Sequence, residues 1–239
     1  FIFKNDQMTR IVLGLITALT LISCSEKKDK KSQSNNPEIA IQSFFYPYDT
    51  VPKIYQYREI KNGMYEQFHR VYGISRSNGK HILVEHFTQD GRHTETYDFL
   101  LNSMLVQDHL VVGAKGDIKS TTVNENKLFP LDRKEICFKS QFSGISDQYV
   151  IDYESCRKFN DYTQRSILSK KMDCMKLNEI LTVTNMDMKL KLKNELTNQI
   201  VRYYAKSIGL VEWHDVNDKQ HFILEDIMTQ NEWLKIISG

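Results

Sequence analysis

Two histidines, His214 and His221, have the spacing that comes closest to a metal site. They flank Asn217-Asp218, which predicts a two-residue turn between two strands. In that register the two imidazoles lie opposite one another, and Glu212 shares their face of the hairpin. Two imidazoles and a carboxylate are ligands that zinc accepts. Because no third histidine is placed nearby, we interpret the pair as an exposed cross-strand contact at a hairpin tip and predict no metal ion.

Other groups of residues suggest catalysis but have the wrong spacing. Three residues separate His81 from Glu85-His86, whereas the inverted zinc motif has two and lies on a helix. The segment from Gly113 to Ser120 contains Lys-Ser without the spacing of a phosphate-binding loop. No Gly-x-Ser-x-Gly nucleophile elbow is present in the sequence. We therefore predict no catalytic residue and no cofactor, and we do not expect an enzyme.

Cysteines offer two further kinds of chemistry. Apolar residues alternate on both sides of a predicted turn at Gly144-Ile145-Ser146. Cys137 and Cys156 then share the opposite, polar face of this hairpin, where a cross-strand disulfide fits. Cys174 would remain as a free thiol, and Cys24 belongs to a different segment. Three reduced cysteines in the domain are the alternative that the sequence leaves open.

The residues before Cys24 indicate a lipid anchor. Arg10 precedes an apolar run from Ile11 to Leu21, which is shorter than the roughly 20 residues of a membrane-spanning helix but suits a signal peptide. The run ends in Leu21-Ile22-Ser23-Cys24, which resembles the lipobox of bacterial lipoproteins. The resemblance implies cleavage before Cys24 and acylation of its thiol and new amine, and two or three chains anchor a protein stably. A plain signal peptide with a chance cysteine, or a short buried helix, is the alternative.

These features divide the chain into three parts. We expect a signal peptide over residues 1–23, with Met8 as the true start, and a lipidated cysteine with a flexible, lysine- and serine-rich tether over residues 24–42. Residues 43–239 would form a single β-rich globular domain. In enterobacterial lipoproteins an Asp after the cysteine retains the protein at the inner membrane, and this chain has Ser25 there. We therefore expect a lipid-anchored protein of the bacterial cell envelope, at the outer membrane.

Composition limits the classes of partner and fold. The formal net charge is +2 over 239 residues, which gives no electrostatic footprint for nucleic acid. The chain has 12 Tyr and 12 Phe but only 10 Gly and 4 Pro, which favours a compact β-rich domain.

Turn signals indicate an antiparallel meander. Asn62-Gly63, Asn78-Gly79 and Asp90-Gly91 predict three type I′ hairpin turns, and the runs between them are rich in aromatic and β-branched residues. Predicted strands cover residues 54–60, 64–74, 81–87, 93–101, 105–112, 135–142, 148–156, 165–172, 175–184, 199–205, 210–215 and 219–227.

Two segments are ambiguous. Apolar residues from Met186 to Leu192 alternate with charges, which predicts a strand buried on one face, and a short helix over Leu190–Asn198 competes with it. Residues Asn231–Gly239 fit either a strand or a helical turn. The fold class that we predict is all-β or mainly β, with the meander forming a strongly curved sheet or half-barrel and little helix.

A segment near the C-terminus carries a second resemblance. The sequence from Tyr203 to Val211 (YYAKSIGLV) resembles a signature of uncharacterised bacterial envelope proteins, which have a second Gly where this chain has Ser207. The resemblance implies the curved half-barrel of the periplasmic lipoprotein carriers, the lipoprotein-localisation-factor-like fold. Gly209, between two strands, fits a bulge or sharp bend. A sheet filled by its own side chains is the alternative to an open concave face.

From these features we expect a non-enzymatic binding or carrier-like lipoprotein. It would be attached to the membrane through Cys24 and would hold a lipid or a partner protein on the concave face of the sheet. The alternative is a structural or interaction module of the cell envelope without a small ligand.

Overall fold

The computed structural model describes residues 41–238, apart from residues 62, 64, 114, 120, 145, 147 and 218. The chain divides into two units, residues 1–34 and residues 35–239. The predicted signal peptide, Met8, Cys24 and Ser25 lie outside the described residues.

Thirteen strands form one antiparallel sheet in the described part of the chain, and one helix follows the last strand. Their bounds are β1 Lys53–Glu59, β2 Glu66–Arg76, β3 Gly79–Thr88, β4 His93–Leu100, β5 Leu105–Val112, β6 Ile118–Lys119, β7 Thr121–Asn126, β8 Ile136–Ser143, β9 Tyr149–Ile167, β10 Lys170–Asp187, β11 Leu192–Ala205, β12 Gly209–Asp215, β13 His221–Thr229 and α2 Gln230–Ser238.

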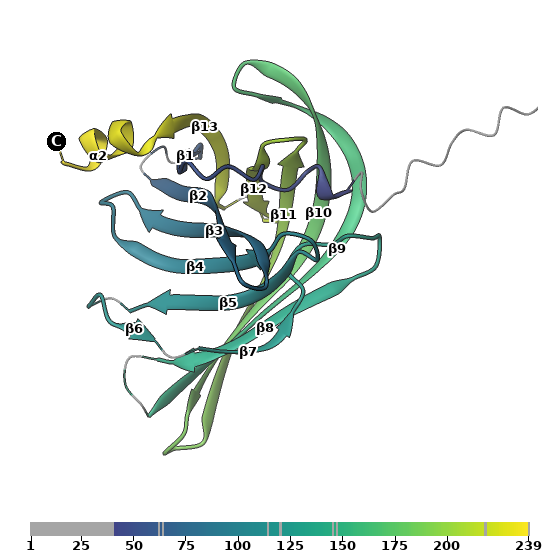
Figure 1. The fold of residues 1–239 in the computed structure, drawn as a ribbon. Coiled ribbons are helices and arrows are strands. Elements are labelled where there is room, and N and C mark those ends of the chain that lie inside the picture. Colours follow the sequence, from purple (N-terminus) through teal and green to yellow (C-terminus); the bar gives the residue numbers. More distant parts are fainter. Residues whose placement is uncertain are drawn as a thin grey trace, which may run out of the picture. The chain divides into compact units, whose positions relative to one another are not determined.

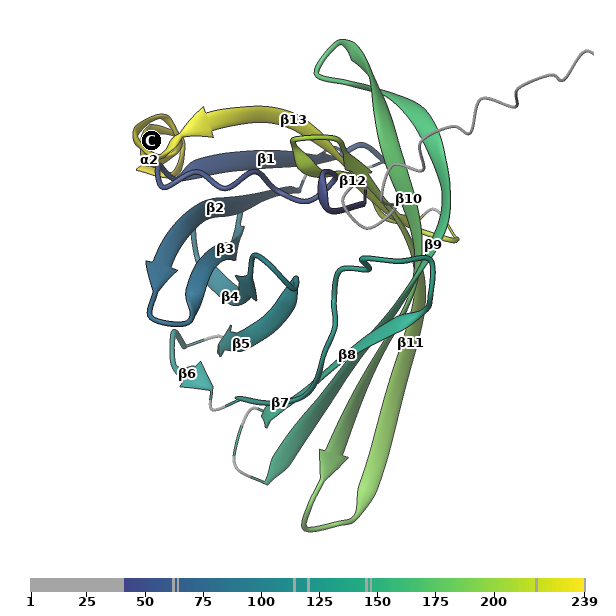
Figure 2. The same ribbon diagram turned by 45° about the vertical axis from the view of Figure 1, so that its right-hand side comes forward.

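The sheet curls into a nearly closed barrel (Figure 1, Figure 2). Its strand order runs from β6 down to β1 and then from β13 down to β7, so that each strand pairs with a sequence neighbour except where β1 pairs with β13. The two edges approach one another, because Leu105 forms a bridge with Lys127 and the Thr121 hydroxyl donates to the carbonyl oxygen of His109. The predicted fold class, a strongly curved antiparallel meander with little helix, is confirmed.

Several predicted boundaries are wrong, because β6, β7 and residues 157–164 of β9 lie outside the predicted strands. The predicted strand over residues 165–172 contains a turn, because β9 runs to Ile167 and β10 begins at Lys170. Leu168 and Ser169 make this turn with φ of 50° and 61°, values that side chains other than glycine rarely adopt, so the sequence carries no turn signal there.

The segment after Asp187 is neither a buried strand nor a helix. Residues 188–191 form the turn between β10 and β11, and Lys191 has a positive φ of 55°. Met188, Leu190 and Leu192 are exposed there, so their alternation does not mark a buried face. The ambiguous C-terminal segment is the helix α2, whose Trp233 packs on the outer side chains Phe68 and Phe87.

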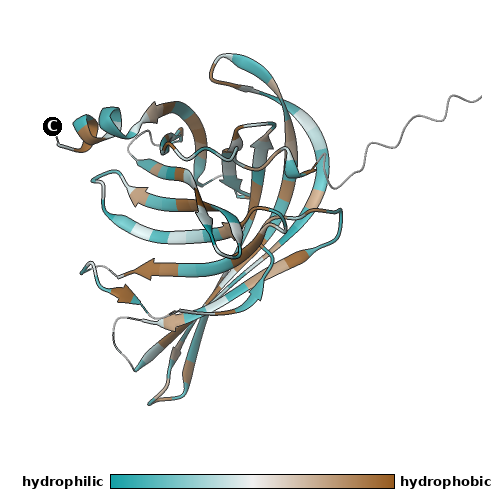
Figure 3. Cartoon of the chain, viewed as in Figure 1, coloured by the Kyte–Doolittle hydropathy of each residue, from teal (hydrophilic) through white to brown (hydrophobic). Residues whose placement is uncertain are grey.

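Apolar side chains from outside the sheet fill one end of the barrel. The ring of Phe45 lies 4.9 Å from that of Phe99 and 4.8 Å from that of Phe129. Tyr46 packs so tightly on Gly209, at φ 104°, that an added Cβ would lie 2.2 Å from the tyrosine ring. Because these aromatic residues occupy the interior, this end of the barrel has a core of its own. Hydrophobic and hydrophilic residues alternate along the strands around it (Figure 3).

Candidate functional site in the barrel interior

A glutamate and two histidines form a hydrogen-bonded group on the inward faces of β3, β4 and β5. Glu95 Oε1 lies 2.7 Å from His86 Nδ1, and Glu95 Oε2 lies 3.2 Å from His109 Nε2. Tyr97 donates its hydroxyl to Glu95 at 2.9 Å. His109 reaches across to β8, where its Nδ1 lies 2.9 Å from Ser140 Oγ. Burial would raise the pKa of Glu95, but the charges and hydrogen bonds of His86 and His109 outweigh it and hold that pKa well below its usual range.

His69 extends this group toward β12. Its ring stacks on His86 at 3.9 Å between centroids and faces Trp213 at 5.8 Å. Burial, and then the charge of His86, hold the pKa of His69 well below its usual range, so the ring is neutral at pH 7. His69 Nδ1 is buried and has no hydrogen-bond partner among the described residues. A buried polar atom of this kind is ordinarily satisfied, so Nδ1 is available to a polar group in the barrel.

Glu179 on β10 organises a second group of charged side chains. It accepts hydrogen bonds from Ser155, Arg202 and Arg157, the last at 3.1 Å between Nε and Oε1. Arg157 also donates to the carbonyl oxygen of Leu128 at 3.0 Å. Burial would raise the pKa of Glu179, but the two guanidinium groups outweigh it and lower the pKa to about 2. The carboxylate is therefore ionised and paired, which a buried charge requires.

Two cavities open beside these groups. One, of about 500 Å³, is lined mainly by polar and aromatic side chains: Gln67, His69, His86, Glu95, Tyr153, Leu181, Asn198, Ile200, Arg202, Trp213, Asp215, Lys219 and Gln220. We call it the chamber. The other, of about 990 Å³, has an apolar floor with charged residues at its side: Val111, Gly113, Lys115, Asp117, Lys119, Phe142, Ser143, Gly144, Tyr149, Ile151 and Asn185. We call it the mouth.

The chamber and the mouth are neighbours along the same strands. Tyr153 of the chamber and Ile151 of the mouth point to the same face of β9, and Leu181 and Asn185 do so on β10. Toward the end of the barrel that Phe45 and Tyr46 fill, the interior narrows to a cavity of about 70 Å³, which these two residues help to line. The open part of the barrel therefore offers polar groups in the chamber and apolar surface in the mouth.

His214 and His221 lie opposite one another in the register of β12 and β13, as predicted, but they are half-buried and not exposed, and the buried Glu212 lies beside them. His221 Nε2 is 2.9 Å and His214 Nδ1 is 4.0 Å from Glu212 Oε1, so three candidate ligand atoms lie close together. Arg165 already binds both oxygens of this carboxylate, with Nε at 2.8 Å from Oε2, and stacks over Tyr203. The guanidinium supplies the countercharge of Glu212, so the geometry fits a structural ion pair better than a metal site.

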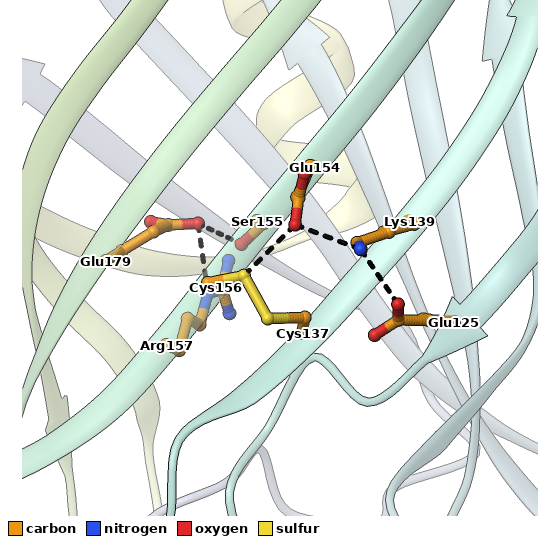
Figure 4. The surroundings of a disulfide bond; sticks show 8 residues. All are labelled: Glu125, Cys137, Lys139, Glu154, Ser155, Cys156, Arg157 and Glu179. Atoms are coloured by element: carbon orange, nitrogen blue, oxygen red, sulfur yellow. Dashed lines mark hydrogen bonds and ion pairs between the residues drawn. A yellow bond between two sulfur atoms is a disulfide. The ribbon is translucent and has the colours of Figure 1, made fainter.

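The hairpin of β8 and β9 places Cys137 directly opposite Cys156, and the two form a disulfide (Figure 4). The bond lies on the outer face, next to Glu154 and Lys139, while Ser155 and Arg157 of the same strand turn inward to Glu179. The third cysteine of the described residues, Cys174, is a buried free thiol whose pKa burial raises to about 11.

His81 and His86 point to opposite faces of β3, as strand alternation requires. His81 lies 2.6 Å from Asp98, and His86 belongs to the group around Glu95. The inward charges Arg157, Glu179 and Arg202 were not predicted from the sequence. A signal exists for Glu179 and Arg202, since the residues two positions before and after each of them are apolar or aromatic.

Comparisons with known proteins add a likeness in shape. No family model and no curated protein sequence matches the chain. A candidate lipoprotein from Parabacteroides distasonis is similar over 77% of this chain and 98% of its own, with a TM-score of 0.48 and 14% identity. A candidate exported protein with a YmcC-like fold from Bacteroides fragilis is similar over 77% of this chain and 99% of its own, with a TM-score of 0.47 and 11% identity.

Among the described residues, no helix has the length and apolar character to cross a membrane.

Proposed function

We propose that the protein is a lipoprotein of the bacterial cell envelope that binds an amphipathic ligand in its barrel without transforming it. Anchoring through an acylated Cys24 follows from the lipobox resemblance, and Ser25 after it favours the outer membrane. The observation that carries the binding proposal is the pairing of a polar chamber with an apolar mouth along β9 and β10.

The chamber suits a head group with acceptor oxygens. Arg202 and His69 line it, and His69 Nδ1 has no partner among the described residues. A wholly apolar ligand would leave His69 Nδ1 buried without a hydrogen bond, which costs about 1–3 kcal/mol. The mouth suits the apolar part of the same molecule, because Phe142, Tyr149 and Ile151 present a half-buried floor there.

Photo-crosslinking in intact cells tests this proposal. Tyr149 is half-buried and lines the mouth, so a photoreactive p-benzoylphenylalanine at this position, which keeps an aromatic ring there, should capture a small molecule. Asn178, exposed on the outward face of β10, is the matched control and should not capture it. A single dominant protein adduct at Tyr149 would instead support the structural or interaction module, and equal labelling at both positions would overturn binding in the barrel.

A further inference from the structure

The turn between β10 and β11 exposes an unusual set of side chains. Met188, Leu190 and Leu192 are exposed by 58%, 61% and 64%. Lys189 and Lys191 alternate with them and are exposed as well. We call these five residues the tip. Large apolar side chains grouped on an exposed turn ordinarily mark a contact surface.

The tip projects beyond the neighbouring strands at the bottom of Figure 1 and Figure 2. It is held firmly, because Asp187 Oδ1 accepts hydrogen bonds from the backbone of Lys189 and Leu190, both at 2.9 Å. Gln148 donates to the other oxygen of Asp187 at 2.7 Å, which ties the turn to the connection before β9. The exposed side chains therefore lie on a hairpin turn that hydrogen bonds hold in place.

The charges around the tip favour an anionic partner. The carboxylate of Asp187 is engaged by the turn itself, and Glu195 pairs with Lys193 at 2.8 Å. No ion pair of the described residues involves Lys189 or Lys191. Their ammonium groups flank Leu190 and remain available to negative groups in solution or at a surface.

We propose that the tip docks on an anionic phospholipid surface, with Met188, Leu190 and Leu192 entering the head-group region and the two lysines binding the lipid charges. Amphipathic elements that bind membrane interfaces combine apolar and basic side chains in this way. A protein partner fits less well, because a stable interface buries about 800 Å² on each side and the tip offers only a few side chains.

A tryptophan at the tip reports this contact directly in the full chain. Leu190→Trp, mixed with vesicles of phosphatidylcholine and phosphatidylglycerol with brominated acyl chains, should shift its emission to the blue and be quenched. Vesicles of phosphatidylcholine alone should give little of either effect. The matched control is Ile118→Trp, because Ile118 is exposed by 71% and belongs to β6, which lies apart from the turn between β10 and β11 in Figure 1. The emission of Trp213 and Trp233 is subtracted with the unsubstituted protein.

Charge recognition is tested in the same background. Each lysine near an anionic surface contributes roughly a fivefold gain in partitioning. Adding Lys189→Gln and Lys191→Gln to Leu190→Trp should therefore weaken the contact roughly 25-fold. Unquenched emission of Leu190→Trp with the anionic vesicles would overturn the proposal. Equal quenching of Ile118→Trp would also overturn it. So would quenching of Leu190→Trp that changes neither with the lysine substitutions nor with the charge of the lipid.

Discussion

Removing the carboxylate of Glu179 should destabilise the barrel strongly. The substitution Glu179→Gln leaves Arg157 and Arg202 in the interior without a countercharge. Breaking a buried pair in this way costs about 3–5 kcal/mol of the free energy of unfolding. Chemical denaturation of the two proteins at pH 7, followed by circular dichroism, measures the difference.

The pH dependence of the unsubstituted protein gives an independent value. The pKa of Glu179 falls from 4.5 to about 2 in the folded state. At about 1.4 kcal/mol for each pH unit, this difference amounts to roughly 3 kcal/mol. Because the folded-state pKa is lowered, this stability is present above about pH 4.5 and is lost as the pH falls toward 2. The Glu179→Gln variant should lack this part of the acid-induced loss.

The matched control is Glu195→Gln, which removes an exposed partner of Lys193. Exposed ion pairs contribute little, so this variant should unfold like the unsubstituted protein. If Glu179→Gln also kept its stability at pH 7 and its acid sensitivity, then Glu179 would not hold the two guanidinium groups, and the account of the interior would be wrong.

Three further predictions concern other parts of the domain. Replacing Cys137 and Cys156 together by Ser should lower the free energy of unfolding by about 3 kcal/mol, since the disulfide closes a loop of sequence separation 19, and denaturation with and without reductant in the unsubstituted protein checks the value. His69→Phe should reduce the loss of stability between pH 7.5 and 5.5, because the folded protein resists protonation of His69 while the unfolded chain binds that proton below about pH 6.5. Unfolding curves across this pH range measure the difference, and equal losses of stability in the two proteins would refute the reasoning. Gly209→Ala should cost about 2 kcal/mol or more in thermal and chemical unfolding, because its φ is 104° and its Cβ would collide with Tyr46; an unchanged melting temperature would contradict the tight contact.

Local signals in the sequence were sufficient for much of the sheet. The Asn-Gly and Asp-Gly pairs mark turns of the meander at the start of the domain, and Gly79 and Gly91 have positive φ values of 137° and 76°. The predicted type I′ geometry is wrong at these two turns, because Asn78 and Asp90 do not have the positive φ that it requires. The turn at Leu168-Ser169 and the turn that ends at Lys191 contain no glycine, although these residues have positive φ values. The predicted strand boundaries are wrong at both turns. Ser207, which stands where the resembled signature has glycine, likewise has a φ of 61°.

The candidate site depended on contacts that local patterns do not encode. Pairing of β1 with β13 and the approach of β5 to β7 close the barrel from distant parts of the chain. The contact of His109 with Ser140 spans 31 residues, and that of Arg157 with Tyr204 spans 47. Strand alternation can place such residues on an inward face, but only the closed sheet brings them together.

Native mass spectrometry of the full chain, released gently from membranes, tests the central claim most directly. We predict a bound amphipathic molecule of defined mass on the unsubstituted protein and on the outward-facing variant Asn178→Trp. Its occupancy should fall on Asn198→Trp, whose indole would take up part of the chamber of about 500 Å³. An unsubstituted barrel free of any bound molecule, or a ligand retained by Asn198→Trp at full occupancy, would contradict binding in the barrel.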